Sequence, residues 1–111
     1  MSTMRNKVQL IGRVGQDPEI KLFKDKKRAS FSLAINELYY DDKGDKVETT
    51  HWHNITVWGN QADFVEKFVG KGRELGIEGK LVNRSFEDKE GTKRYITEVA
   101  VSEFLLIGGV R

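Results

Sequence analysis

Apolar residues recur at every second position over long stretches of this 111-residue chain, and this alternation limits its fold more than any other feature. Successive side chains of a β-strand point to opposite faces, so a period of two gives one apolar face for a core and one polar face for solvent. Turn-forming residues fall between the alternating stretches. The pattern predicts a chain that is mostly sheet.

The first strand is expected over Val8–Val14. It stops near Gly15, because Pro18 fixes φ and cannot donate to a β-ladder. The alternation resumes over residues 20–22. A turn over residues 24–27 then leads into the second strand, whose core positions are expected to be Ala29, Phe31, Leu33 and Ile35.

The third strand follows a hairpin tip rich in Asp and runs from about Lys46 to Trp58. By parity, its odd positions, such as Ile55 and Val57, face the core. Its even positions, among hydroxyl and amide side chains, hold both tryptophans, Trp52 and Trp58. A tryptophan that needed only burial would belong on the other side.

One helix is expected after the third strand. Four apolar residues between positions 64 and 69 have helical spacing. Asn60 is expected to cap the first turn, with Asp63 three residues on, and Gly70 is expected to end the helix in the left-handed conformation.

Two more strands flank a second hairpin tip at Glu87–Thr92. Five strands with one helix between the third and fourth is the order of the all-β OB-fold, a five-stranded, partly open Greek-key barrel. Residues 1–111 are expected to form one such domain. The alternating positions that indicate the last two strands are Leu75, Ile77, Gly79 and Leu81, then Tyr95, Thr97, Val99 and Val101. On the fourth strand, Leu75, Ile77 and Leu81 are expected to face the core.

Aromatic rings away from the core face are the main functional signal. Phe86 shares its parity with Lys80 and Arg84, opposite the core positions of the fourth strand. Phe86 and the two tryptophans therefore place aromatic rings among cations on the polar faces of these strands. Two tyrosines follow the apolar run of the second strand. The rings of this kind are Tyr39, Tyr40, Trp52, Trp58 and Phe86.

Rings among cations suit a single-stranded nucleic acid, whose unpaired bases offer π-faces and whose backbone offers regular negative charge. Stacking contributes about 1–3 kcal/mol per base and tolerates every sequence. Duplex DNA fits poorly because its bases already stack on one another. The alternative function is a non-catalytic protein-interaction or oligomerisation module anchored on Trp52 and Trp58, whose binding would hardly respond to salt.

Several motifs, in order along the chain, carry a family resemblance from about Asn6 to Val101. They are Asn6-Lys7-Val8, the pattern Gly-x-x-Gly-x-Asp-Pro-Glu over residues 12–19, Trp52-His53, Ile77-Glu78-Gly79-Lys80-Leu81, and Arg94-Tyr95 leading to Thr97-Glu98-Val99. The chain resembles the bacterial single-stranded DNA-binding proteins. The resemblance implies an OB-fold that assembles as a homotetramer and binds single-stranded DNA in replication, recombination and repair, with little sequence preference and without catalysis.

The resemblance also implies roles for individual positions. Asn60 stands where the family often has a lysine, so no cation is carried over to that position. Whether Tyr39 or Tyr40 is the stacking ring stays open. The implied roles are base stacking for Tyr39, Trp52, Trp58 and Phe86, phosphate contact for Lys7, Arg13, Lys71, Arg84 and Arg94, and a subunit contact for His53.

Family members usually continue into a Gly-, Pro- and Gln-rich tail that ends in an acidic peptide and recruits replication and repair proteins. This chain stops at Gly108-Gly109-Val110-Arg111, so we expect those partners only if such a tail exists outside it. Whether the tail was removed or is naturally missing is open.

No apolar run could span a bilayer, and Met1–Gly12 lacks the apolar core of a secretory signal, so we expect a cytoplasmic, nucleoid-associated protein.

The formal net charge of +2 hides an uneven distribution, with +5 over residues 1–30, −5 over residues 31–66 and +2 over the rest. His51 and His53 share a face but lack a third ligand of suitable spacing, and the chain has no cysteine, so we expect no metal and no cofactor. Two histidines at one site offer no Ser-His-Asp arrangement. We therefore expect no enzyme, with a nuclease-like small barrel as the catalytic alternative.

Overall fold

The computed structural model describes residues 3–107; the chain end at residues 108–111, on which the expectation of a missing tail rests, lies outside them. No helix within that range is long and apolar enough to cross a membrane. The elements, in chain order, are a 3-10 turn η1 (Thr3–Asn6), β1 (Val8–Val14), β2 (Glu19–Phe23), β3 (Lys26–Tyr40), β4 (Lys46–Trp58), α1 (Asn60–Phe68), β5 (Glu74–Glu87) and β6 (Lys93–Leu106).

The strands form one sheet in the order β1-β5-β6-β4-β3-β2, which a further pairing of β1 with β3 closes. That closure joins Arg13 to Ala34 and Val14 to Leu33. The predicted first strand, Val8–Val14, is confirmed as β1. The alternation expected over residues 20–22 forms a separate strand, β2, which pairs only with β3 among the described strands. The remaining five strands make the closed barrel, so the predicted OB-fold is confirmed.

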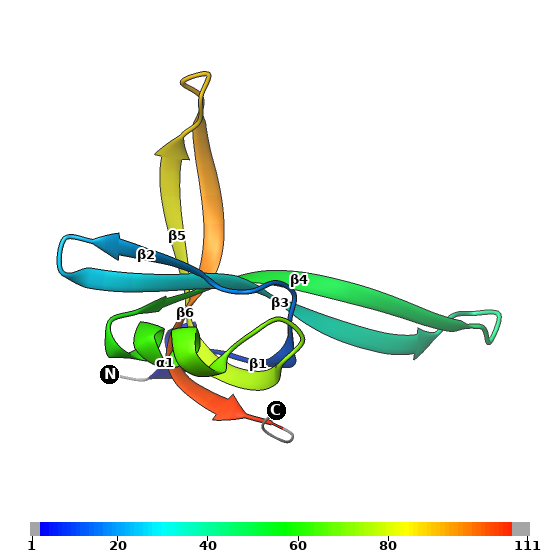
Figure 1. The fold of residues 1–111 in the computed structure, drawn as a ribbon. Helices are drawn as coiled ribbons and strands as arrows, with labels where there is room; N and C mark the ends of the chain where they lie inside the picture. Colours follow the sequence, from blue (N-terminus) through cyan, green and yellow to red (C-terminus); the bar gives the residue numbers. More distant parts are fainter. Residues whose placement is uncertain (1–2, 108–111) are drawn as a thin grey trace.

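Three hairpins project from the barrel in different directions (Figure 1). The β3–β4 hairpin turns at residues 41–45 and the β5–β6 hairpin at residues 88–92, and Gly44 and Gly91 take left-handed φ values of 84° and 81° there. The β2–β3 hairpin is shorter and turns at Lys24 and Asp25, so β3 begins two residues earlier than the sequence predicted. The long strands therefore supply both the barrel wall and its arms.

The expected core is confirmed except where strands run beyond the barrel. Pairing of β1 with β5 begins at Val8 opposite Gly79, so β1 does not cover the next part of β5. Leu81 is consequently 49% exposed, so its assignment to the core was wrong, and Tyr95, on the β5–β6 arm, is 73% exposed. The largest fully buried side chains are Val14, Leu33, Ile55, Val57, Val65, Leu75 and Val99.

Helix α1 lies against the barrel, as Figure 1 shows, and buries Ala62 and Val65. Both predicted caps are wrong. Gly59 is the N-cap residue, with no side-chain cap hydrogen bond, so Asn60 is already helical. At the other end Val69 is extended and its N–H donates to the Val65 carbonyl at 2.9 Å, while the left-handed glycine of this segment is Gly72 rather than Gly70.

Ion pairs, rather than a cap, tie the helix to the sheet. The Lys27 ammonium on β3 lies 2.7 Å from Asp63 Oδ1 and 2.7 Å from Glu66 Oε1. Hydrogen bonds to these two carboxylates raise the pKa of Lys27, and the hydrogen bond from Lys27 lowers the pKa of Asp63. Asp63 therefore holds the helix in place from within its first turn.

Close approach between β5 and β6 requires a glycine at position 79. A Cβ there would overlap the Ala100 carbonyl oxygen. The pairing slips at this point, because Glu78 faces Glu103 while Gly79 faces Val101, which leaves Ser102 as the extra residue of a bulge. The Ser102 hydroxyl donates to the Glu78 carbonyl at 3.1 Å.

We expect Gly79→Ala to lower the free energy of unfolding by about 1–3 kcal/mol, because the backbone of β6 must move to admit a methyl group. Gly70→Ala is the matched control, because a Cβ there would meet only Asp17, at 3.7 Å, and its cost should stay within about 0.5 kcal/mol. Urea denaturation measures both, and equal stability of the two variants would contradict the argument.

Candidate nucleic-acid interface

Both tryptophans stand on the outer face of β4. In the β3–β4 register Trp52 lies opposite Ala34 and Trp58 opposite Arg28. Trp52 is 61% exposed and Trp58 42%, whereas their core-side neighbours Ile55 and Val57 are buried. The parity prediction is therefore confirmed for both rings.

The Trp52 ring lies against the turn that follows β1. A Cβ on Gly15 would overlap the six-membered part of the indole, so this glycine makes room for the ring. The Gly15 N–H donates to the Ser32 carbonyl of β3 at 2.9 Å, which fixes the turn beneath it. One side of the indole is supported by backbone, and the side chain still remains largely open.

The Trp58 ring belongs to a cluster that the sequence analysis missed. Phe23, the last residue of β2, packs against Trp58 with ring centroids 5.7 Å apart. The Arg28 guanidinium carbon lies 4.8 Å from the Phe23 ring centre and 5.8 Å from that of Trp58. Parity offered the signal, since Arg28 falls on the same side of β3 as Ser30, away from the core positions.

The same face continues onto the β5–β6 hairpin. Thr56 of β4 pairs with Ala100 of β6, and from there the register carries the face along β5 to Arg84 and Phe86. Phe86 is 44% exposed, and the Arg84 guanidinium carbon lies 6.0 Å from its ring centre. We call this surface, defined by Trp52, Trp58, Phe86, Arg28 and Arg84, the aromatic face.

A polar groove of about 260 Å³ lies within the aromatic face, between the β2–β3 and β5–β6 hairpins. Arg28 and Arg84 line it, together with Asn54 from β4 and Glu98 from β6. Hydrogen-bond donors and acceptors therefore lie between the rings of Trp58 and Phe86. Such a groove suits a polar, flat ligand better than an apolar side chain.

Two of the expected phosphate-contacting arginines hold carboxylates on this part of the molecule. Arg84 Nε donates to Glu98 Oε1 at 2.9 Å and its Nη2 to Oε2 at 3.3 Å, and these bonds raise the pKa of Arg84. Glu98 is only 6% exposed, so this pair is fixed in the barrel wall. Arg94 Nε donates to Asp88 Oδ2 at 2.8 Å and lowers the pKa of that carboxyl, but Arg94 is itself 60% exposed.

The other expected cations lie away from the groove. Arg13 approaches Glu74 at 3.8 Å, and its Nη1 donates to the Gly72 carbonyl at 3.1 Å. Lys71 makes no ion pair within residues 3–107, and its backbone N–H donates to Asp17 at 2.9 Å. Both flank the turn that supports Trp52, because the Gly72 N–H donates to the Val14 carbonyl.

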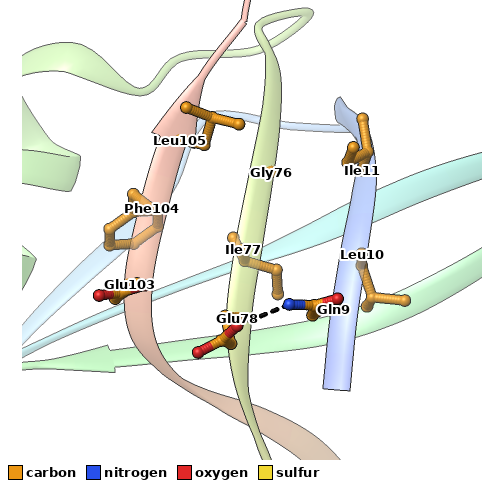
Figure 2. A pocket seen from close by; sticks show the side chains of 9 residues that line it. All are labelled: Gln9, Leu10, Ile11, Gly76, Ile77, Glu78, Glu103, Phe104 and Leu105. Atoms are coloured by element: carbon orange, nitrogen blue, oxygen red, sulfur yellow. Dashed lines mark hydrogen bonds between the residues drawn. The ribbon is translucent and has the colours of Figure 1, made fainter. Parts of the chain in front are cut away.

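Lys7 lies on a different surface, 3.6 Å from Glu78 of β5. Gln9 donates to the same carboxylate at 2.7 Å, and these contacts lower the pKa of Glu78, with the Gln9 bond as the largest cause (Figure 2). Ile11 and Leu105, in the same view, are 58% and 62% exposed and border an open apolar pocket of about 300 Å³. This surface of β1, β5 and β6 is the second distinctive face of the molecule.

The two tyrosines at the end of β3 point to opposite sides of the β3–β4 arm. Thr50 bonds to Asn36 at 2.8 Å on one side, and His51 approaches Glu37 at 3.6 Å on the other. The register places Tyr40 with Thr50 and Trp52, and Tyr39 with Glu37 and His51. Tyr40 is 69% exposed and Tyr39 50%, so both rings are accessible.

The expected subunit-contact residue, His53, is half-buried and lies opposite Leu33 in the register. His51, its neighbour on the same side of β4, contacts a single carboxylate. Among residues 3–107 no three His, Cys, Asp or Glu side chains gather as a possible metal site.

The fold and the site together define an oligonucleotide-binding barrel with an open aromatic surface. A family profile described as "Single-strand binding protein family" matches residues 5–107. "Single-stranded DNA-binding protein 1" of Xylella fastidiosa is 40% identical over 105 residues, covering 93% of this chain and 77% of that protein. "Single-stranded DNA-binding protein" of Bacteroides thetaiotaomicron is 43% identical over 105 residues, covering 92% and 65%.

Among solved structures, the one described as "Plasmodium falciparum SSB complex with ssDNA" superposes with a TM-score of 0.84 at 34% identity, covering 93% of this chain and 95% of that one. The chain therefore belongs to the single-strand binding protein family. It spans less than two thirds of the length of several curated relatives, including 60% of the one from Neisseria meningitidis.

The two tyrosines give a direct comparison. If a bound strand stays on the side of the β3–β4 arm that carries Trp52, Tyr40→Ala should weaken binding of oligo(dT) by about 1–3 kcal/mol, and Tyr39→Ala should change it little. If the bound DNA instead crosses to the other side of the arm, Tyr39→Ala should show the loss of affinity and Tyr40→Ala should not. Fluorescence titration of both variants decides between these paths, and full affinity in both would remove this arm from the site.

Proposed function

We propose that this chain binds single-stranded DNA without sequence specificity and protects it during replication, recombination and repair. The supporting observation is the exposure of Trp52 and Trp58 beside buried Ile55 and Val57 on one strand. Two large rings that could have joined the core stand outside it, in a family whose relatives are named for binding single-stranded DNA.

Bases stack on the open rings in this proposal. Trp52, Trp58 and Phe86 provide stacking surfaces along the aromatic face, and Tyr39, with Tyr40 as its alternative, extends them along the β3–β4 arm. Every base has a π-face, so stacking holds the strand without reading its sequence.

Lysine and arginine side chains neutralise the phosphates. The pairs of Arg13 with Glu74 and of Arg94 with Asp88 lie at the surface, where water and salt weaken them, so a phosphate can replace the carboxylate. Arg84 behaves differently, because breaking its pair with Glu98 would leave the buried Glu98 carboxylate without a counter-charge. It keeps its carboxylate and offers its remaining N–H groups, while Lys7 and Lys71 complete the proposed set.

The proposed role is binding alone, without catalysis, and its place is the cytoplasm, on chromosomal DNA. Family membership supports both statements. Replication and repair proteins would join through an acidic tail only if the protein has one outside this chain.

The assembly that we propose is a homotetramer. The Val8–Gly12 part of β1 pairs with β5 on one side, while β1–β3 pairing involves only Arg13 and Val14. That stretch therefore has a free edge within the described chain, which a second copy can pair with. Ile11 and Leu105 offer an exposed apolar surface on the same sheet, and His53 is the third contact we propose.

Titration with oligo(dT) should quench most of the tryptophan fluorescence, because both indoles lie on the proposed interface. Trp52→Ala should cost about 1–3 kcal/mol of binding free energy. Phe68→Ala removes a comparably exposed ring from α1 and should leave affinity unchanged.

The affinity of the wild-type protein should fall with salt, at a slope of about −0.7 per phosphate contact. Unquenched emission at saturation, or a flat salt response, would favour the protein-interaction module instead.

The assembly can be tested by light scattering. The wild-type protein should show a mass of four 12.7 kDa chains, and Ile11→Glu or Leu105→Glu should reduce it, because each variant introduces charges into an apolar contact. Leu22→Glu, at a residue on β2 that is 71% exposed, is the control and should keep the wild-type mass. A wild-type monomer would refute the proposed tetramer.

A further inference from the structure

The cluster of Phe23, Arg28 and Trp58 lies where three strands meet at the end of the aromatic face. Arg28 faces Lys21 of β2 on one side and Trp58 of β4 on the other, and Phe23 ends β2 just beyond. All three pairs within the cluster are in contact, at 4.8, 5.8 and 5.7 Å between ring or guanidinium centres. Separate strands therefore position one compact unit.

The two rings of this cluster remain accessible. Phe23 is 44% exposed and Trp58 42%, although Val57, next to Trp58 in the chain, and Ala29, next to Arg28, are fully buried on the core side. An aromatic pair that served the core would have been covered in the same way. The pair instead presents an edge of π-surface next to the polar groove, which Arg28 also lines.

The charge of Arg28 is uncompensated in this structure. Arg13, Arg84 and Arg94 each pair with a carboxylate, whereas the side chain of Arg28 makes no salt bridge and no hydrogen bond with any residue from 3 to 107. Its Nε is buried and has no hydrogen-bond partner there. Contact with two ring faces orients the guanidinium but supplies no anion.

We infer that Phe23, Arg28 and Trp58 form one nucleotide-binding subsite, in which the rings take a base and Arg28 takes the adjoining phosphate. The ligand is a nucleotide of the single strand that follows the aromatic face, so this inference rests on the proposed function. The bound strand then reaches the β2–β3 hairpin, beyond the rings that sequence comparison assigns.

Two substitutions separate the parts of the subsite. Phe23→Leu keeps an apolar side chain against Arg28 and removes the π-face. Its affinity for oligo(dT) should fall roughly 5- to 150-fold, the loss that one stacked base represents. Arg28→Gln removes the charge and should flatten the salt dependence of binding by a slope of about 0.7, one phosphate contact. Arg28→Lys should restore the slope.

Matched controls lie on helix α1. Phe68 packs against Phe64 with centroids 5.1 Å apart and a tilt similar to that of the Phe23–Trp58 pair, so Phe68→Leu controls for the loss of a ring. Lys67→Gln controls for the loss of a charge. Neither should alter affinity or salt slope, and circular dichroism melts verify that all variants are folded.

The outcomes distinguish the two levels of the proposal. If the wild-type protein binds oligo(dT) and Trp52→Ala weakens it, while Phe23→Leu and Arg28→Gln match their controls, the subsite is overturned and the proposed function stands. If the wild-type protein binds no oligo(dT), both fall. A change in affinity without the change in salt slope for Arg28→Gln refutes the phosphate contact.

Discussion

The antiparallel pairing of β3 with β4 sets the rest of the structure. It runs without a break from Arg28 opposite Trp58 to Tyr40 opposite Lys46. Because side chains alternate between faces, a slip of one residue would drive both tryptophans into the barrel and expose Ile55 and Val57. The buried residues therefore fix the register, and the register fixes where the rings stand. The same β3–β4 register therefore determines both the packing of the core and the exposure of the aromatic rings.

The distribution of charge follows a second constraint, which separates permanent ion pairs from exchangeable ones. Arg84 is joined to the buried carboxylate of Glu98 in the barrel wall. Arg13 and Arg94 hold their partners at the surface, where water and salt compete with each pair. A small net charge is thereby compatible with local cationic sites, which a phosphate can enter without disturbing the fold.

The sequence predicted the long strands, their core positions within the barrel and the exposure of the tryptophans, because alternation over many residues is a strong and local signal. It failed where neighbouring elements decide. Leu81 has the parity of a core residue, but β1 no longer covers it, and Gly59 rather than Asn60 begins the helix. The parity of Arg28 places it on the outer face of β3, but its contact with Phe23 could not be predicted, because only the folded β2 brings that ring against it.

Gly15 lies under the indole of Trp52, and this contact has a consequence for binding. A ring that rests on a backbone turn loses few rotamers when a base arrives, so most of the conformational entropy of ordering it has been lost during folding. An aromatic side chain standing alone in water would lose that freedom at each encounter with DNA. The turn after β1 thus preorganises the surface that we propose for base stacking.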